Sequence, residues 1–210
     1  MKDIIIRCMA LGRAGANCYF AYNKDSKECV IIDAPGEEDR IIEELTKLSL
    51  TPVAILLTHS HFDHIGAIKG LREFYHMPVY CHETEAELLE TPALNLTALV
   101  GIGYGLKANN TLKDEEIVEL AGIRIKTMHT PGHTSGCACY YLEEEGILFS
   151  GDTLFAESVG RTDFPTGSSN ELVDSIVNKL FTLPDETTVY PGHNESTTIA
   201  HEKQYNRYVR

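Results

Sequence analysis

The chain carries Thr58-His59-Ser60-His61-Phe62-Asp63-His64 directly after an apolar run at 53–57. In extended backbone, residues i and i+2 project to the same side, so His59 and His61 can reach one point in space. Asp63 and His64 follow where the chain is expected to turn into a helix, and they can address a second point. Imidazole and carboxylate groups are ligands that zinc and similar metals accept. The segment therefore predicts a metal site, with an exposed polar turn as the plainer alternative.

Three further candidate ligands follow apolar, strand-like runs later in the chain. They are His133, Asp152 and His193, and each is preceded by a glycine. A glycine allows close approach of the backbone. Taken alone, any one of the three would be an ordinary loop residue. Together with the first cluster they indicate one site that is built from several strand ends.

With these motifs the chain resembles the metallo-β-lactamase superfamily over nearly its full length. The resemblance implies an α/β fold, an αββα sandwich with its metals at one edge. The ligands that it implies for the first metal are His59, His61 and His133. Those for the second metal are Asp63, His64 and His193, and Asp152 would bridge the two. The implied cofactors are two divalent metal ions, with Zn²⁺ first and iron or manganese as alternatives.

Within the superfamily the closer likeness is to glyoxalase II, the hydroxyacylglutathione hydrolase group. It rests on residues 58–66 (THSHFDHIG), 149–155 (FSGDTLF) and 190–193 (YPGH). Residues 160–165 (GRTDFP) look like those of its short single-domain members. The resemblance implies a hydrolase that cleaves S-lactoylglutathione or a related acyl thioester with a metal-bridging hydroxide. Asp63 would be the catalytic residue that orients this hydroxide and manages its proton.

Other positions are less specific. Asp33 closes an apolar strand and matches the superfamily's early aspartate, so it either supports the histidine loop from behind or is a turn residue. Phe155 and Arg161 fall where substrate contacts are expected, although Arg161 could instead pair with Asp163. Full-length glyoxalase II enzymes add a basic C-terminal extension that holds glutathione. This sequence ends at Arg210 without one, so the thiol carrier stays open.

Other functions fit the same residues. Persulfide dioxygenases of the superfamily share the Gly-Arg-Thr-Asp-Phe stretch and bind one iron, here through His59, His133 and Asp152. Their last motif typically reads Pro-Ala-His-Asp, whereas residues 191–194 read Pro-Gly-His-Asn, which favours the hydrolase. Lactone, ester or β-lactam hydrolysis is a further alternative. A metal-binding domain without catalysis is disfavoured, because structural zinc sites are usually closed and rich in sulfur.

Composition limits the context. The 210 residues, 43% of them hydrophobic, fit a single metallo-β-lactamase-fold domain over 1–210. The net charge of -13 argues against nucleic acid or an anionic membrane as a partner. The partner that the resemblance implies is a small-molecule thioester substrate. The acidic run of Glu83, Glu85, Glu87 and Glu90 is expected to be solvated. Six cysteines without a C-x-x-C pair and the absence of a signal-peptide pattern favour the cytoplasm. The oligomeric state stays open.

Strand-like and helical runs alternate in two similar successions. Strands are predicted at 4–9, 18–22, 29–33, 53–57, 78–81, 117–128, 137–142, 146–149 and 188–190. Helices are predicted at 37–48, 65–75 and 170–181, and from 83 and 199 onward. Residues 91–112 are the least regular, and three glycines make them a candidate mobile loop. This loop could cover the site, with Tyr104 or Leu106 touching the substrate.

Overall fold

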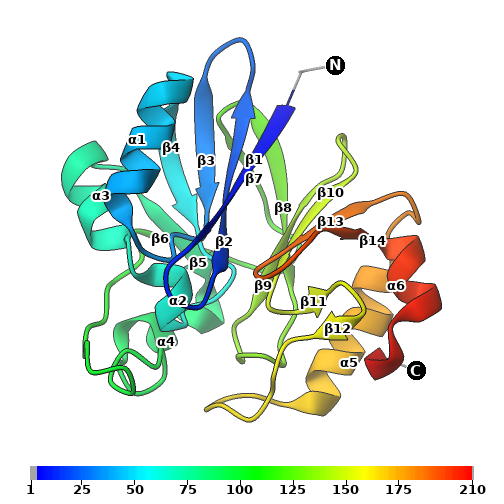
Figure 1. Cartoon of the computed structure of the whole chain (residues 1–210). Coiled ribbons are helices and arrows are strands. Elements are labelled where there is room, and N and C mark those ends of the chain that lie inside the picture. Colours follow the sequence, from blue (N-terminus) through cyan, green and yellow to red (C-terminus); the bar gives the residue numbers. More distant parts are fainter. Residues whose placement is uncertain (1–3, 210) are drawn as a thin grey trace.

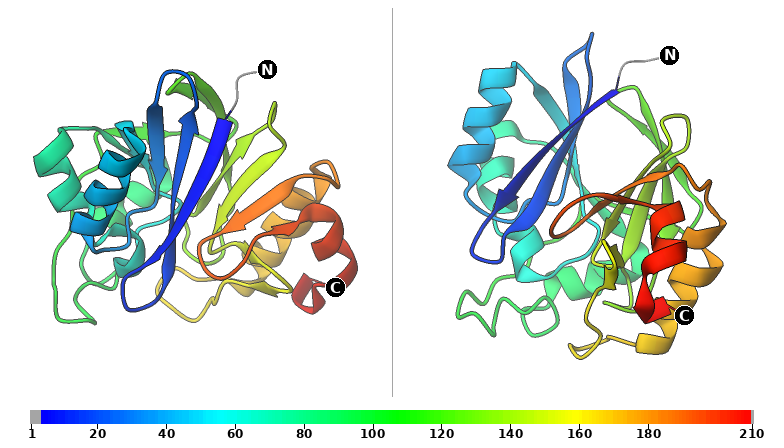
Figure 2. Two further views of the ribbon diagram at one scale, coloured as in Figure 1. Left: turned by 45° about the horizontal axis from the view of Figure 1, so that its top comes forward. Right: turned by 45° about the vertical axis from the view of Figure 1, so that its right-hand side comes forward.

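Two β-sheets of six strands each lie face to face, and helices cover their outer surfaces (Figure 1). The structure, a computed structural model, describes residues 4–209. Two further views show the N-terminal half of the chain on one side of the sandwich and the C-terminal half on the other (Figure 2). The arrangement confirms the predicted αββα sandwich.

The first half of the chain forms one sheet and the helices that cover it. Its strands, in spatial order, are β1 (Ile4–Leu11), β2 (Ala16–Asn23), β3 (Glu28–Ile32), β4 (Thr51–Leu56), β5 (Val79–His82) and β6 (Asn110–Leu112). Its helices are α1 (Glu38–Leu48), α2 (Phe62–Ile65), α3 (Ile68–Tyr75), η1 (Glu83–Glu85) and α4 (Ala86–Glu90). From β3 to β6 the neighbouring strands run parallel, so their C-terminal ends share one edge.

The second half forms the other sheet. Its strands, in spatial order, are β14 (Thr197–Thr198), β13 (Thr188–Pro191), β10 (Ile147–Gly151), β9 (Ala138–Leu142), β8 (Ile123–His129) and β7 (Ile117–Leu120). A small hairpin, β11 (Leu154–Phe155) and β12 (Ser158–Val159), follows β10. The helices are α5 (Ser169–Asn178), η2 (Leu180–Thr182), α6 (Ile199–Tyr205) and η3 (Arg207–Val209).

Three apolar layers hold these elements together. In β2, Tyr19 and Ala21 face the second sheet and pack with Phe149, whereas Cys18 and Phe20 belong to the layer under α1 and α3. The alternation follows from the period of two along a strand, and both faces are apolar because both are covered. A third layer lies between the second sheet and α5. The continuous apolar runs of the sequence are therefore strands that are buried on both faces.

Two predicted elements are divided in the structure. The helix predicted at 65–75 becomes α2 and α3 and breaks near Gly66, where a Cβ would meet the Pro35 carbonyl oxygen at 2.3 Å. The strand predicted at 117–128 is the hairpin of β7 and β8. Its two-residue turn is Ala121-Gly122, with φ of 53° and 68°, a conformation that suits tight hairpins.

The irregular segment is anchored rather than detached. Residues 91–109 contain no helix or strand, and residues 110–112 form β6, which the sequence pattern missed. The side chains of Asn95 and Thr97 donate to the Tyr104 carbonyl oxygen, and the Tyr104 hydroxyl donates to the Ile65 carbonyl oxygen at 2.6 Å. Tyr104 and Leu106 consequently pack against the core layer beneath α3.

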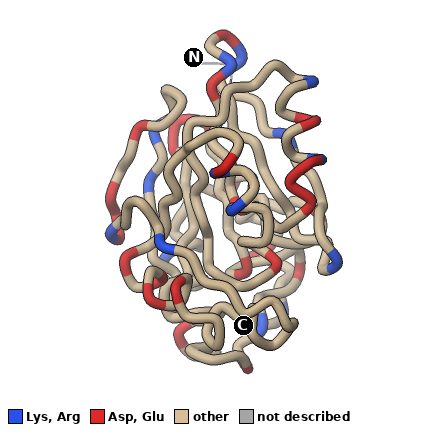
Figure 3. The backbone as a smooth tube through the Cα atoms, turned by 90° about the vertical axis from the view of Figure 1, so that its left-hand side faces the viewer, with Lys and Arg blue, Asp and Glu red and all other residues tan. Residues whose placement is uncertain are grey.

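Charge and thiol placement agree with the composition. Lys and Arg positions are interspersed with Asp and Glu in the view of Figure 3, which shows no broad basic face. All six cysteines are free, and five of them are buried, including Cys137 and Cys139. Across residues 4–209 there is no helix with the length and apolar character needed to cross a membrane.

An aromatic contact joins the end of β5 in the first sheet to the end of β8 in the second. His82, the last residue of β5, stacks on His129, the last residue of β8, with ring centroids 4.0 Å apart and planes 5° apart. Burial and the nearby His129 lower the pKa of His82 to about 4, and Asp114 only partly opposes this shift. The Thr84 N–H donates to His82 Nδ1, which caps η1.

This stack should make stability depend on pH. The unfolded imidazole takes up a proton near pH 6.5, whereas His82 in the folded chain resists protonation down to about pH 4. As the pH falls through this window, the free energy of unfolding should therefore decrease by about 3 kcal/mol because of His82. His82→Asn keeps an acceptor for Thr84 but cannot titrate here, so denaturation curves of the variant should lose that share of the pH dependence. Parallel pH profiles of the two proteins would contradict this prediction.

Candidate metal centre

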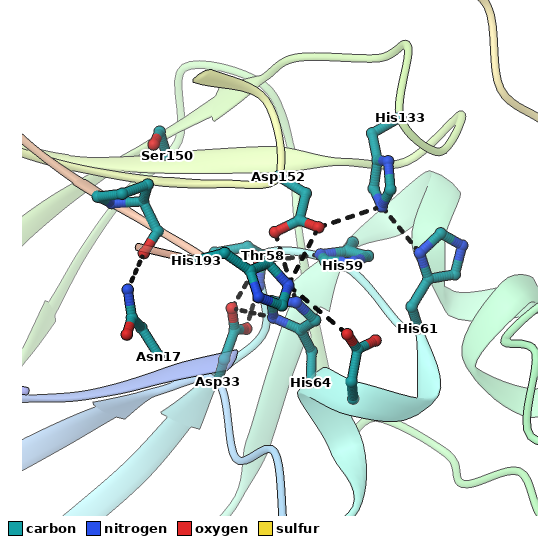
Figure 4. Close-up of polar contacts among 12 residues, drawn as sticks. Asn17, Asp33, Thr58, His59, His61, His64, His133, Ser150, Asp152 and His193 are labelled. Atoms are coloured by element: carbon teal, nitrogen blue, oxygen red, sulfur yellow. Dashed lines mark hydrogen bonds and ion pairs between the residues drawn. The ribbon is translucent and has the colours of Figure 1, made fainter. Parts of the chain in front are cut away.

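The residues predicted to bind metal lie at one edge of the sandwich, where strands of both sheets end (Figure 4). The segment 59–64 follows β4, whereas His133, Asp152 and His193 follow β8, β10 and β13. Three overlapping groups of donor atoms result, each with its atoms within 4.8 Å of one another. The groups are His59, His61 and His133; His59, His64 and Asp152; and Asp63, His64 and His193. All seven positions singled out in the sequence are thus brought together.

Asp152 lies between the other donors. Its Oδ1 is 3.4 Å from His64 Nε2, and its Oδ2 is 3.6 Å from both His133 Nε2 and His193 Nε2. Close approach depends on Gly192, because a Cβ at this position would come within 2.1 Å of Asp152 Oδ1. The Asp152 carboxylate can therefore contact cations held by His133 on one side and by His64 and His193 on the other.

The donor set fits cations better than it fits hydrogen bonding within itself. His59 Nε2, His64 Nε2 and Asp152 Oδ1 are buried, and no described residue forms a hydrogen bond with them. The Nδ1–H of His133 donates to the Arg161 carbonyl oxygen at 2.6 Å, so the other ring nitrogen of His133, Nε2, carries the free lone pair. This Nε2 lies 2.8 Å from His61 Nδ1. A buried polar atom without a partner costs about 1–3 kcal/mol. Neutral imidazoles around a shared carboxylate suit zinc, iron or manganese, so these residues could hold two cations.

Electrostatics separate the donors into two kinds. Burial and the neighbouring imidazoles hold the pKa of His59 and His61 well below the ordinary value, so both rings are neutral, as metal ligands must be. Burial disfavours the charge of His64 as well, but Asp152 and Asp33 raise its pKa to about 10, so a bound cation would replace the proton on its Nε2. Burial raises the pKa of Asp63, yet its contact with His193 and the charge of His64 hold it below its usual range. Asp63 is consequently ionised at neutral pH.

Asp33 contacts the motif from behind, which agrees with the first of the two alternatives that the sequence left open. Its carboxylate accepts from the Thr58 N–H at 2.8 Å, from the Thr58 hydroxyl at 2.7 Å and from His64 Nδ1 at 2.8 Å. A proton fixed on Nδ1 leaves Nε2 of His64 free to face Asp152. On the opposite side, Asn17 Nδ2 donates to the carbonyl oxygens of Pro191 and Asn194, which flank His193. The sequence offered one signal for Asn17, a single amide within an apolar run.

The expectation that Glu85 is solvated is wrong. Its side chain is 0% exposed, whereas Glu83, Glu87 and Glu90 are exposed as predicted. Burial raises the pKa of Glu85 to about 7, against hydrogen bonds from Ser60 and Thr134 that lower it. The available signal was helical spacing, because Glu85 shares an i, i+3, i+4 face with the buried Leu88 and Leu89.

A cavity of about 450 Å³ opens onto the donors. Its remaining lining is formed by Phe62, Leu96, Phe155, Val159, Arg161 and Phe164. Phe155 and Arg161 thus lie where substrate contacts were predicted. The structure also pairs Arg161 with Asp163 through two contacts of 2.7 Å and stacks its guanidinium 3.9 Å from the Phe164 ring. From the irregular segment, Leu96 reaches this cavity, whereas Tyr104 and Leu106 line a different one beside α3, contrary to the expectation that they touch substrate.

Comparison with known proteins decides the family. The model of the Metallo-beta-lactamase superfamily matches residues 11–193, from the end of β1 to the last histidine of the site. The chain belongs to this superfamily. A superfamily relative from Bacillus subtilis (strain 168), "Probable metallo-hydrolase YqgX", is 38% identical and covers 97% of this chain and 96% of its own. "Hydroxyacylglutathione hydrolase GloC" from Haemophilus influenzae is 34% identical and covers 92% of each chain.

Solved structures of differently named proteins share the fold of this chain. The crystal structure of BLEG-1 B3 metallo-beta-lactamase has a TM-score of 0.93 at 41% identity and covers 98% of this chain and 99% of that one. ETHE1 from Myxococcus xanthus has a TM-score of 0.82 at 32% identity, with coverage of 97% and 83%. TTHA1623 in a di-iron-bound form has a TM-score of 0.84 at 35% identity, with coverage of 96% and 99%. The fold and the metallo-hydrolase superfamily are therefore shared.

Replacement of Asp33 should weaken metal binding without removing a candidate ligand. Asn tolerates the left-handed backbone that Asp33 adopts, with φ of 56°, so Asp33→Asn should fold. The amide cannot accept from both Thr58 groups and His64 together, and we expect the dissociation constant for Zn²⁺ to rise about 10- to 100-fold. Competition against a chromogenic chelator measures this constant. The exposed Asp185→Asn serves as the control, and equal affinities of the two variants would contradict the prediction.

Proposed function

We propose that this protein is a binuclear metallohydrolase that cleaves acyl thioesters, S-lactoylglutathione or a related compound. The observation that carries the proposal is the pair of donor groups that share Asp152 at the floor of a cavity. His59, His61 and His133 would hold one cation, and Asp63, His64 and His193 the other. The likeness to a hydroxyacylglutathione hydrolase at 34% identity supports the thioester. Free, buried thiols support a cytoplasmic location.

The bound cations would supply Lewis-acid activation of water and of the scissile carbonyl group. The side chains would position the water and transfer its proton. Asp63 lies in the cavity wall, stays ionised, and can orient the attacking water and accept its proton. The oxygen of water forms the new bond to the acyl carbon, the carbon–sulfur bond breaks, and the departing thiolate takes up the proton. Asp152 lies between the two donor groups, with His64 at 3.4 Å and His133 at 3.6 Å, and would contact both cations.

The cavity wall beside the donors is mainly apolar. Phe62, Leu96, Phe155, Val159 and Phe164 present hydrophobic surface beside the donors and would exclude bulk water from the reacting bond. Arg161 is the single Lys or Arg in the lining, and its guanidinium is already paired with Asp163. Recognition of a charged thiol carrier would therefore depend on Arg161 and Asp163 and not on the donors at the floor of the cavity.

A second candidate is a persulfide dioxygenase with one iron on His59, His133 and Asp152. The likeness to ETHE1 at 32% identity supports this alternative. TTHA1623 in a di-iron-bound form supports iron as a metal in this superfamily. Asp63, His64 and His193 converge on a further position. This favours the binuclear hydrolase, because a single iron at the first position would leave these three donors without a cation to bind.

Metal content and turnover distinguish these functions. Protein purified without added metals should contain about two metal ions per chain and should hydrolyse S-D-lactoylglutathione. One iron per chain with sulfite formed from glutathione persulfide and oxygen would establish the second candidate instead. Lactone, ester and β-lactam substrates belong in the same panel. Bound metals with no turnover of any substrate would indicate a metal-binding domain without catalysis.

Asp152→Ala should remove the second metal and the activity together. The variant loses the carboxylate that faces both groups, so we expect kcat/KM to fall more than about 100-fold. Metal analysis of the purified variant should show fewer ions per chain than the wild type. Full activity with two bound metals would refute the proposed mechanism.

Arg161 and Asp163 should affect substrate preference in opposite directions. Arg161→Ala should lower kcat/KM for S-lactoylglutathione about threefold, as for an exposed ionic contact, with little change in kcat. Asp163→Ala frees the guanidinium and should raise the same constant by a similar factor. Steady-state kinetics with the anionic thioester and an uncharged one measure both effects. Unchanged selectivity in both variants would show that Arg161 is only a structural ion pair.

A further inference from the structure

The buried carboxylate of Glu85 lies outside the set of candidate ligands and contacts the loops that carry them. Ser60, which stands between His59 and His61, donates to Oε1 through its N–H at 2.7 Å and its hydroxyl at 2.6 Å. Thr134, the neighbour of His133, donates through its hydroxyl to Oε2 at 2.7 Å. One carboxylate thus joins two segments that are 72 residues apart and provide all three histidines of the first donor group.

Glu85 forms no ion pair with any described residue. Its described partners are uncharged, namely Ser60, Thr134 and the Gly136 N–H. The backbone of the Thr134 loop packs directly on η1, because a Cβ at Gly136 would come within 2.3 Å of the Glu85 nitrogen. A fully buried carboxylate without a cationic partner costs stability, and a hydrophobic residue at this position would be more stabilising. Stability alone therefore does not explain Glu85, whereas a role in positioning the two loops does.

We propose that Glu85 is a positioning residue that sets the separation of the His59–His61 segment from His133, and with it the affinity and geometry of the first metal site. The inference rests on the proposed metal sites. Asp33 orients the second donor group through His64, and Glu85 does the corresponding work for the first group through Ser60 and Thr134. Outer hydrogen-bond partners of metal ligands act in this way on affinity.

The test compares Glu85→Gln with Glu202→Gln. Glu202 is also 0% exposed and accepts from Thr197, Asn206 and the Glu157 N–H, none of which is next to a candidate ligand. Both variants replace a buried carboxylate and should lose stability. Only Glu85→Gln should raise the dissociation constant for Zn²⁺, by about 10- to 100-fold, and alter the visible absorption of the Co²⁺-substituted protein.

Milder variants keep the inference testable if Glu85→Gln does not fold. Thr134→Val and Ser60→Ala each remove one donor to Glu85, and each should weaken Zn²⁺ binding about three- to tenfold. Wild-type affinity and an unchanged Co²⁺ spectrum in these variants would overturn the inference, as would an equal loss of affinity in Glu202→Gln. Because the readout is metal affinity, the result is independent of turnover. Absence of thioester hydrolysis by the wild type would count against the proposed function alone.

Discussion

Burial of unpaired donor atoms at the seam of two sheets is the constraint that the rest of the structure satisfies. His59 and His64 are 0% exposed, and their free ring nitrogens face one another and Asp152. Such groups would separate in a flexible loop, since imidazoles compete for the same space and lose their water. The strand ends prevent this. The Tyr140 hydroxyl donates to the Leu57 carbonyl oxygen and the Ala138 N–H donates to that of Thr58, which joins the second sheet to the chain directly before the motif.

Two buried carboxylates hold the motif from different sides. Asp33 follows β3 and accepts from Thr58 and His64, whereas Glu85 follows β5 and accepts from Ser60. The strands β3, β4 and β5 are parallel neighbours, so the residues that follow β3 and β5 flank the loop that follows β4. The topology of the first sheet thus explains why residues remote in sequence support the same six-residue segment. Parallel strands deliver their C-terminal ends to one edge, and that edge becomes the site.

The sequence predicted the candidate donors and offered Asp33 as one of two alternatives, but it did not predict the supporting role of Glu85. His133, Asp152 and His193 could be predicted because each is a ligand-type residue after a glycine and an apolar run. Glu85 could not be separated from Glu83 and Glu87 by charge, because its burial depends on tertiary contacts with Ser60 and Thr134. The same holds for β6, a three-residue strand whose pairing with β5 supplies what its local pattern lacks. The pairing of a short edge strand depends on its neighbours more than on its own sequence.

Under the proposed function, substrate selectivity would come from the walls of the cavity. Proteins named as a B3 metallo-beta-lactamase, ETHE1 and GloC resemble this chain at 32–41% identity, so a common fold accommodates different activities. Here the walls are mainly aromatic and aliphatic, and the one Arg is tied to Asp163. A hydrophobic wall distinguishes acyl groups by only about 1–3 kcal/mol per methylene. Under the proposed function, such a cavity would select acyl groups mainly by their size.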